Sequence, residues 1–312
     1  MKIAIIGQQD FGKAVLEAFT KRGDTVAAVF CAPDKPGARP DALHVAAAAL
    51  GLPVLQFASL RGTDATDALR ALDVDLAVMA YVLQFAPQTL LNIPKYGTIQ
   101  YHPSLLPKHR GPSSINWPIA MGATETGLTI FRPTDGLDEG PIILQKRCAI
   151  GPNDTLGDVY FKHLFPNGVA ALLEAADALV AGTHQQIGQD EANASYEGWF
   201  RDDEAKINWA NSVDQVYNLI RAANPAPGAW CMLGGIKVRL FDCRKHGLKT
   251  FGAVRGKPGE IAKLTDESVF INGQGGQIEV LRLKPDGGQK MSAAEFARSH
   301  GLSPAVRATA FG

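Results

Sequence analysis

The chain has 312 residues, 46% of them hydrophobic and 20% charged, which is ordinary for a globular protein of about two domains. Its 31 basic and 31 acidic residues balance, and the part from Phe200 onwards holds sixteen Lys/Arg against eleven Asp/Glu. This bias is far weaker than the charge of a basic nucleic-acid-binding module, so charge gives no support to a DNA partner.

The cysteines and the N-terminus favour the cytoplasm. Cys31, Cys148, Cys231 and Cys243 form no CxxC pair, so they fit neither a disulfide framework nor a zinc site, and no metal is expected. The apolar run at residues 3–6 is too short for a signal peptide, and no run approaches the roughly 18 apolar residues of a membrane span. We therefore expect a cytoplasmic protein without a membrane partner.

The first part of the chain alternates apolar strands with helical stretches. Strands are expected at residues 2–6, 25–31, 52–55 and 75–80, and helices at residues 11–21, 42–50 and 64–72. This alternation predicts a parallel sheet covered on both faces.

The pattern changes after Tyr81, and a strand is expected at residues 97–101. Residues 126–131 and 141–149 alternate apolar and polar residues, which is typical of strands exposed on one face. A long helix is expected at residues 155–181, with Asp154 or Thr155 as its N-cap.

Residues 183–203 are polar and aperiodic, and we interpret them as a linker between a domain at 1–182 and a second at 204–312. The second domain begins with one helix at residues 212–222. Short strands separated by Gly-rich breaks follow, at residues 236–241, 259–264, 268–272 and 278–283. Short strands with many turns predict a small barrel.

The sequence IGQQDFG, at residues 6–12, lies where a dinucleotide-binding fingerprint would lie. The middle glycine, which lets the backbone approach a pyrophosphate, is replaced by Gln9, and no acidic residue ends the second strand. We expect no bound NAD. Instead, Gly7 and Gly12 are expected to allow a tight turn and close packing of the helix on the strand.

The sequence QYHPSLLPKHRG, at residues 100–111, leaves a predicted strand at its carboxyl end, the edge at which open α/β sheets bind ligands. A second polar turn, TDGLDEG, occupies residues 134–140. His102 and Asp138 can form a proton-transfer pair across these loops. His102 can equally be a hydrogen-bonded structural residue, and Asp135 and Asp138 can be turn formers. The residues alone indicate a hydrolytic or group-transfer site without a defined substrate.

These segments resemble the folate-dependent formyltransferases, which include methionyl-tRNA formyltransferase, sugar-amine formyltransferases and the hydrolase domain of 10-formyltetrahydrofolate dehydrogenase. The resemblance is carried by HPSLLPKHRG (102–111), TGLTI (126–130) and GLDEGPIILQ (136–145). It extends along the chain through IGQQDFG, INW (115–117), LFPNG (164–168), AKINW (205–209) and NPAPGAW (224–230). It is strongest for the amino-terminal hydrolase domain of the dehydrogenase.

The resemblance implies an α/β fold: a Rossmann-like formyltransferase domain with a mostly parallel sheet, followed by a small OB-like β-barrel. It implies 10-formyltetrahydrofolate as formyl donor, with His102 and Asp138 as catalytic residues. Gln100 is expected to supply a further amide donor to the oxyanion. The folate-binding cleft is expected to be shaped by residues 81–85 and by the loop at 132–138, and its expected members are Tyr81, Val82, Leu83, Gln84, Phe85, Thr134 and Asp135.

Two departures leave the formyl acceptor open. The transferases carry an asparagine where Gln100 stands, whereas the hydrolase domain has an apolar residue there. The stretch at residues 34–41 is short and of mixed charge, whereas the tRNA-specific transferases have a longer basic loop. We therefore expect water or a small-molecule amine as acceptor, with tRNA less favoured.

Three further expectations follow. A non-catalytic folate- or RNA-binding protein is the alternative of another class, and the presence of both His102 and Asp138 argues against it.

His109 and Arg110 either contact an anionic part of a substrate, such as the folate glutamate, or form a solvated basic turn. The chain ends at Gly312 without the carrier and dehydrogenase modules of the fused enzyme, so no NADP-dependent oxidation is expected.

Overall fold

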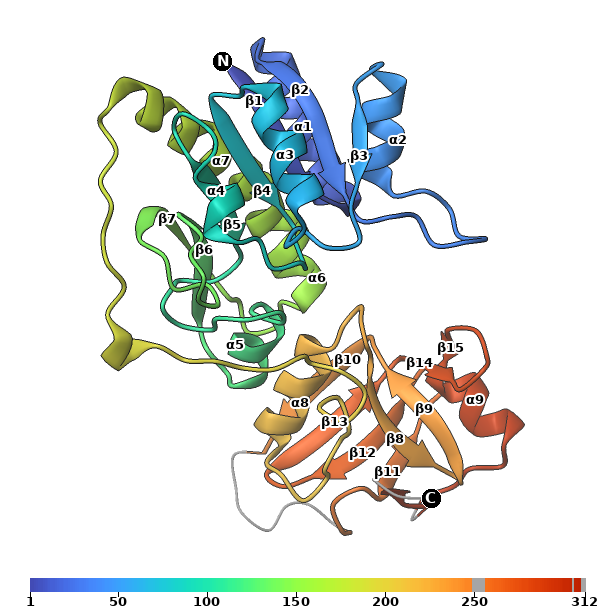
Figure 1. Cartoon of the computed structure of the whole chain (residues 1–312). Coiled ribbons are helices and arrows are strands. Elements are labelled where there is room, and N and C mark those ends of the chain that lie inside the picture. The colour runs from blue at the N-terminus through green and yellow to red at the C-terminus, as the bar shows by residue number, and fades with distance from the viewer. Residues whose placement is uncertain (249–255, 305, 310–312) are drawn as a thin grey trace. The chain divides into compact units, whose positions relative to one another are not determined.

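The computed structural model describes residues 1–248, 256–304 and 306–309. The chain divides into two compact units (Figure 1). The first unit is formed by Met1–Ser114, Thr126–Cys148 and Phe161–Glu197, and the second by Ile115–Glu125, Ala149–Tyr160 and Gly198–Gly312.

A seven-stranded sheet forms the centre of the first unit, in the order β3-β2-β1-β4-β5-β6-β7. Its strands are β1 (Lys2–Gly7), β2 (Thr25–Cys31), β3 (Val54–Gln56), β4 (Leu76–Ala80), β5 (Thr98–His102), β6 (Glu125–Phe131) and β7 (Ile142–Ala149). The first five are parallel, and β6 is antiparallel to β5. The predicted α/β class with a mostly parallel sheet is confirmed.

Helices cover both faces of this sheet. They are α1 (Gln9–Arg22), α2 (Ala42–Ala49), α3 (Thr63–Leu72), α4 (Gln88–Leu91) and α7 (Phe165–Ala181). Alternate residues of β1 point to opposite faces, and both sets are buried: Ala4 and Ile6 pack in the core cluster that includes residues of α3 and α4. On the other face, Phe11 of α1 stacks on Tyr101 of β5 with ring centroids 4.3 Å apart.

The prediction that β6 is exposed on one face is wrong. Every residue of β6 after Glu125 is buried, because the loop that follows β5 packs on β6: Leu106 lies in one apolar cluster with Phe131, and Leu105 lies over Gly127. Its polar Thr129 is satisfied by the loop that follows β5: Thr129 Oγ1 donates to Ser104 O at 2.7 Å and accepts from Leu106 N at 3.1 Å. The alternating exposure holds for β7, the edge strand.

The single long helix predicted at residues 155–181 is divided. Thr155 caps α6 (Leu156–Val159) through a capping box with Asp158, as one of the two expected caps, and a π-helix (Tyr160–Leu164) then leads into α7. Pro166 lies in the first turn of α7, where its missing N–H costs no helical hydrogen bond.

By length and composition alone, the helical stretch Leu156–Ala181 could cross a membrane: it has 26 residues, and an 18-residue window within it has a mean hydropathy of 1.4. The stretch is interrupted by Asp158, Lys162, Glu174 and Asp177, so it is not the continuous apolar run that the sequence analysis found absent. Core helices pass the same test, and α7 buries one face against the sheet and α1. The residues of that face are Gly168, Ala171, Leu172, Ala175, Ala176 and Leu179.

The second unit contains two antiparallel sheets, in the orders β10-β13-β12-β11 and β15-β14-β9-β8-β16, which agree with the predicted small barrel. Its strands are β8 (Ala229–Leu233), β9 (Ile236–Leu240), β10 (Cys243–Gly247), β11 (Ile261–Leu264), β12 (Val269–Gly273), β13 (Gly276–Val280), β14 (Arg282–Pro285), β15 (Met291–Ser292) and β16 (Ala308–Thr309). Its helices besides α6 are α5 (Asn116–Ala120), α8 (Val213–Ala222) and α9 (Ala293–Ser299). The strand predicted at residues 278–283 is two strands, interrupted at Leu281.

Asp202 links the start of the second unit to β9. Its carboxylate accepts hydrogen bonds from Arg239 Nη1 at 2.5 Å and Lys237 Nζ at 2.6 Å. The hydrogen bond from Arg239 is the main cause that lowers the pKa of Asp202 to about 2, and the bond from Lys237 acts in the same direction. The carboxylate is 44% exposed, so solvent screens much of the attraction.

Replacing Asp202 by asparagine is expected to lower the free energy of unfolding at pH 7 by roughly 0.5–1 kcal/mol. Because the folded-state pKa is depressed, the contribution is present above about pH 4 and is lost as the pH falls towards 2. Urea unfolding of both proteins between pH 3 and 7 measures the difference. Asp266→Asn is the control, since no cation pairs with the Asp266 side chain in the described part of the chain. A difference that does not change with pH would contradict the assignment.

Candidate functional site

His102 is the last residue of β5, so it lies at the carboxyl edge of the parallel strands. Its side chain is 7% exposed, and its Nδ1 lies 3.6 Å from Oδ2 of Asp138, which is 10% exposed. The structure therefore brings together the two residues of the expected proton-transfer pair, at the sheet edge where ligands bind α/β folds.

Three consecutive residues hold this pair. His109 O accepts a hydrogen bond from His102 Nε2 at 2.9 Å, and Gly111 N donates to Asp138 Oδ2 at 2.9 Å. Between them, Arg110 is 1% exposed. Residues 109–111 thus contact both members of the pair, one through a carbonyl and the other through an amide.

The contact at Nε2 constrains the protonation of His102. A backbone carbonyl only accepts, so Nε2 carries a proton. In the neutral ring, Nδ1 is then a lone pair facing the Asp138 carboxylate, and this arrangement offers no hydrogen bond. The two groups are 3.6 Å apart, slightly beyond hydrogen-bond distance, so an imidazole and a carboxylate stand ready as acid and base partners.

Gln100 lies two residues before His102 on β5, so both side chains point to the same face of the sheet. Its register neighbours are Met79 of β4 and Phe131 of β6. Within the described residues no hydrogen bond is formed by its amide group, which is partly exposed. This leaves an amide donor free beside the pair.

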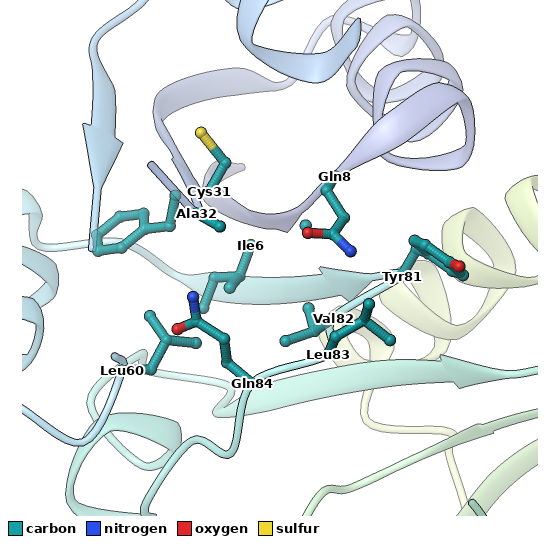
Figure 2. Close-up of a pocket in the computed structure, with 11 residues that line it drawn as sticks. Ile6, Gln8, Cys31, Ala32, Leu60, Tyr81, Val82, Leu83 and Gln84 are labelled. Carbon is teal, nitrogen blue, oxygen red and sulfur yellow. The ribbon is translucent and has the colours of Figure 1, made fainter. Parts of the chain in front are cut away.

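A pocket opens at the carboxyl ends of β1, β2 and β4 (Figure 2). Four of the seven expected folate-binding residues line it: Tyr81, Val82, Leu83 and Gln84. The remaining lining residues come from the ends of β1 and β2 and from Leu60; they are Ile6, Gly7, Gln8, Phe30, Cys31, Ala32 and Leu60. The lining is uncharged and largely apolar, which suits a neutral ring system.

Two features of this pocket depart from ordinary packing. Tyr81 has a φ of 61°, a left-handed conformation that costs free energy for a residue with a side chain. Gln84 donates from Nε2 to Phe57 O at 3.0 Å, but its Oε1 is buried and has no hydrogen-bond partner in the described structure. A buried acceptor without a donor is the kind of group that a ligand N–H would satisfy.

The other three expected folate-binding residues lie outside the pocket. Phe85 is 39% exposed, with the Arg61 guanidinium 4.5 Å above its ring. Asp135 Oδ1 accepts from Gln88 N at 3.3 Å, which fastens the turn at residues 134–140 to the start of α4. Thr134, which precedes Asp135 in this turn, is also absent from the pocket lining.

Close packing accounts for the glycines of the incomplete dinucleotide fingerprint. A Cβ on Gly7 would lie 2.1 Å from Ala80 O, and one on Gly12 would lie 3.0 Å from the Leu43 side chain. Both glycines therefore serve packing, as expected. The backbone amide of Gln9 donates to Asp41 at 2.8 and 2.9 Å, so a carboxylate of the chain itself lies at the start of α1.

The hypothesis that Arg110 contacts an anionic part of a substrate is wrong. Its side chain has no solvent exposure and is neutralised within the protein. Arg110 Nη2 donates to Glu191 Oε1 at 2.6 Å and to Gln189 Oε1 at 2.8 Å, and Nη1 contacts the Tyr196 hydroxyl. The hydrogen bond from Arg110 lowers the pKa of Glu191, so this pair stays ionised. His109 faces Glu197, with 3.1 Å between Nδ1 and Oε1.

Sequence reasoning missed these partners, which all lie in residues 189–197, a segment we call the strap. The strap belongs to the first unit and bonds along the loop after His102: Arg110 N donates to Ser195 O at 2.9 Å, and Ser195 N donates to Pro107 O at 3.1 Å. Its aperiodic, polar sequence predicted part of a linker instead. The segment does contain several acidic and amide residues without helical or strand periodicity. Such a cluster was the available sign that it could bind a buried cation such as Arg110.

No group of three or more His, Cys, Asp or Glu side chains that could hold a metal ion exists in the described residues. The side chains gathered at the sheet edge are an imidazole, a carboxylate and amide groups. These groups can move a proton and stabilise a developing oxyanion.

Comparison with known proteins agrees with this kind of site. Residues 1–175 match the formyl transferase family, and residues 200–301 match the formyl transferase C-terminal domain. The chain belongs to the formyl transferase family.

Curated relatives differ in length. The chain is 36% identical to the human mitochondrial 10-formyltetrahydrofolate dehydrogenase over 99% of this chain and 34% of that protein. It is 32% identical to the methionyl-tRNA formyltransferase of Syntrophus aciditrophicus (strain SB) over 97% of both chains. The chain thus spans about a third of the length of the dehydrogenases it matches.

Solved structures share the fold. HypX from Aquifex aeolicus, in complex with tetrahydrofolic acid, superimposes with a TM-score of 0.69 at 19% identity, over 97% of this chain and 48% of that chain. The N-formyltransferase from Helicobacter canadensis, in complex with folinic acid and dTDP-3-aminofucose, gives a TM-score of 0.67 at 20% identity, over 90% and 99%.

Proposed function

We propose that this chain removes the formyl group from 10-formyltetrahydrofolate and delivers it to water or to a small-molecule amine, in the cytoplasm. The observation that carries the proposal is the His102–Asp138 pair at the carboxyl edge of the sheet of a formyl transferase family member, with 3.6 Å between Nδ1 and Oδ2. Transfer of a formyl group needs a proton acceptor for the nucleophile and a proton donor for the departing nitrogen, and a carboxylate and an imidazole can fill these two roles.

The pocket at the carboxyl ends of β1, β2 and β4 suits a reduced folate. The uncharged pocket lined by Val82 and Leu83 suits a pterin ring, and the unpaired Gln84 Oε1 suits one of its N–H groups (Figure 2). Arg61, stacked on Phe85, has no carboxylate partner within the described residues, so its charge is available to the glutamate of folate. Folate supplies the formyl group; the residues of the chain bind it, orient it and move the proton.

The roles we assign follow from position. Asp138 accepts the proton of the attacking water or amine and holds His102 in its orientation. His102, the imidazole at the carboxyl end of β5, donates to the formyl oxygen or to the departing nitrogen. Gln100, whose amide is free and on the same face as His102, donates to the oxygen that gains negative charge.

Transfer to methionyl-tRNA is a second candidate. The alignment with a methionyl-tRNA formyltransferase over 97% of both chains favours it. Against it stands the mixed charge of residues 34–41, since tRNA affinity depends on phosphate contacts.

Incubation with 10-formyltetrahydrofolate alone, with amine acceptors and with methionyl-tRNA tests the proposal. Formate release without an acceptor supports hydrolysis, and turnover only with an added small amine supports transfer. Turnover only with methionyl-tRNA would favour the second candidate. Folate binding without any turnover would overturn the enzymatic assignment in favour of a binding protein.

Replacing Arg61 by alanine is expected to raise the KM for 10-formyltetrahydrofolate about 5- to 20-fold, the range of one charge-assisted contact of about 1–2 kcal/mol, with kcat within a factor of two. Arg70→Ala is the matched control, because Arg70 is an exposed arginine of α3 already paired with Asp67. Steady-state kinetics with a donor that lacks the glutamate provides the second check: there, Arg61→Ala should have no effect. An equal loss with both donors would contradict the contact.

A further inference from the structure

The pair His102–Asp138 needs support, because Asp138 has a φ of 56°. A non-glycine residue in this left-handed region carries a cost of order 1 kcal/mol and persists only where neighbouring contacts fix it. The adjoining chain is equally restricted: a Cβ on Gly140 would lie 1.5 Å from Arg132 O. The turn that carries the carboxylate is therefore held in one conformation by its surroundings.

Gln189 of the strap makes the contacts that fix this turn. Its Nε2 donates to Asp138 O at 2.7 Å and to Gly140 O at 2.8 Å. Its Oε1 accepts from Arg110 Nη2 at 2.8 Å and from Arg110 Nε at 3.1 Å. The amide orientation is unambiguous, since carbonyls only accept and a guanidinium only donates. One amide thus uses all four of its hydrogen bonds.

These bonds join the two halves of the site. On one side, Gln189 holds the backbone that carries the Asp138 carboxylate. On the other, it holds Arg110, whose neighbours His109 and Gly111 contact His102 and Asp138 directly. Glu191 adds an ion pair with Arg110, which keeps the guanidinium fixed in the interior.

We infer that Gln189 is a positioning residue that sets the separation of His102 and Asp138, through the turn at residues 138–140 and the side chain of Arg110. This rests on the proposed function for its catalytic consequence. The strap lies between the two family matches, and the inference gives it a part in the chemistry of the first unit. Because the side chain of Gln189 touches neither the imidazole nor the carboxylate, its loss should reduce kcat and leave folate affinity largely intact.

Gln189→Glu separates positioning from simple support of Arg110. A carboxylate at this position would pair with the Arg110 guanidinium at least as well as the amide does. It would also place negative oxygen against the carbonyls of Asp138 and Gly140, where the amide now donates. A merely structural role at Arg110 therefore predicts a tolerated change, whereas the positioning role predicts a damaged site.

The experiment compares Gln189→Glu, Gln189→Met and the control Gln186→Glu, which makes the same charge change at an exposed glutamine three residues before the strap. We expect both Gln189 variants to lower kcat at least 10-fold, with KM within a factor of three, at an assay temperature well below their measured melting temperatures, so that the protein is folded throughout. Gln189→Met is neutral, so it also removes any direct effect of charge and serves if Gln189→Glu does not fold.

A second measurement does not depend on turnover. The ring nitrogens of ¹⁵N-labelled histidine are compared by NMR, with the His102 signals assigned from a His102→Asn sample. Gln189→Met is expected to move the His102 signals, whereas Gln186→Glu leaves them in place. Wild-type kcat in either Gln189 variant, or unmoved His102 signals in Gln189→Met, overturns the inference. Absence of formyl release by the wild-type protein would refute the proposed function instead, and the NMR comparison would still decide the role of Gln189.

Discussion

Replacing His102 by asparagine is expected to lower kcat for formyl release or transfer at least about 100-fold, the usual scale for one acid–base group. The substitution removes the donor at Nε2 and the nitrogen that lies 3.6 Å from Asp138 Oδ2. Since His102 is 7% exposed at the end of a buried strand, asparagine fits the space and the fold should persist. The expected loss is therefore chemical.

Asp138→Asn should cause a loss of similar size, because the amide keeps an oxygen for Gly111 N but removes the charge that faces His102. The double variant should be hardly slower than either single one, as for residues that act as a unit. Single-turnover measurement of formyl release, with folate binding measured separately, checks both. His163→Asn, in the π-helix outside the site, is the control. Near-wild-type release by His102→Asn would refute the proton-transfer assignment.

The largest expected loss of stability follows from replacing Gly7 by alanine. Gly7 ends β1 and is paired in register with Ala80 of β4, so a methyl group there would lie 2.1 Å from Ala80 O. The neighbour is backbone in the middle of a sheet that is buried on both faces, and it can yield only if the two strands separate. We expect a loss of about 2–3 kcal/mol in the free energy of unfolding, at the upper end for overpacked cores.

Urea denaturation of the Gly7→Ala protein measures this loss. Gly198→Ala is the matched control: a Cβ there meets nothing within 4 Å, and its φ is not left-handed. That substitution should be neutral or slightly stabilising, since it restricts the unfolded chain. Equal stability of the two variants would show that β1 and β4 can separate at little cost.

Much of the fold could be predicted from sequence because its strands carry strong local signals. The continuous apolar runs of β1, β2 and β4 and the spacing of Phe11, Val15 and Phe19 in α1 directly reflect burial on both faces. The prediction for β6 was wrong for a physical reason. The sequence does not show whether a threonine such as Thr129 is buried or exposed. That depends on the loop whose backbone accepts the hydrogen bond of its hydroxyl group.

Within the candidate site, His102 and Asp138 could be paired from sequence because each lies in a rigid, distinctive turn near the same sheet edge. The role of Arg110 could not, because its partners are about 80 residues away in a segment without period. Ion pairs between distant segments leave no periodic trace in a sequence. The expected folate residues were found in part: residues 81–84 line the pocket, whereas Phe85, Thr134 and Asp135 lie outside it.

The strap also defines the smallest fragment that could carry the first unit. A fragment ending at residue 175, where the family match ends, or at residue 182 would retain His102 and Asp138 but omit Gln189, Glu191 and Tyr196. It would remove the three side chains that hydrogen-bond the Arg110 guanidinium and leave the Glu139 carboxylate, 3.9 Å from Nη1, as its ion-pair partner. A fragment that keeps the native contacts of Arg110 must therefore extend at least to Glu197, and it still contains two short segments of the second unit, Ile115–Glu125 and Ala149–Tyr160.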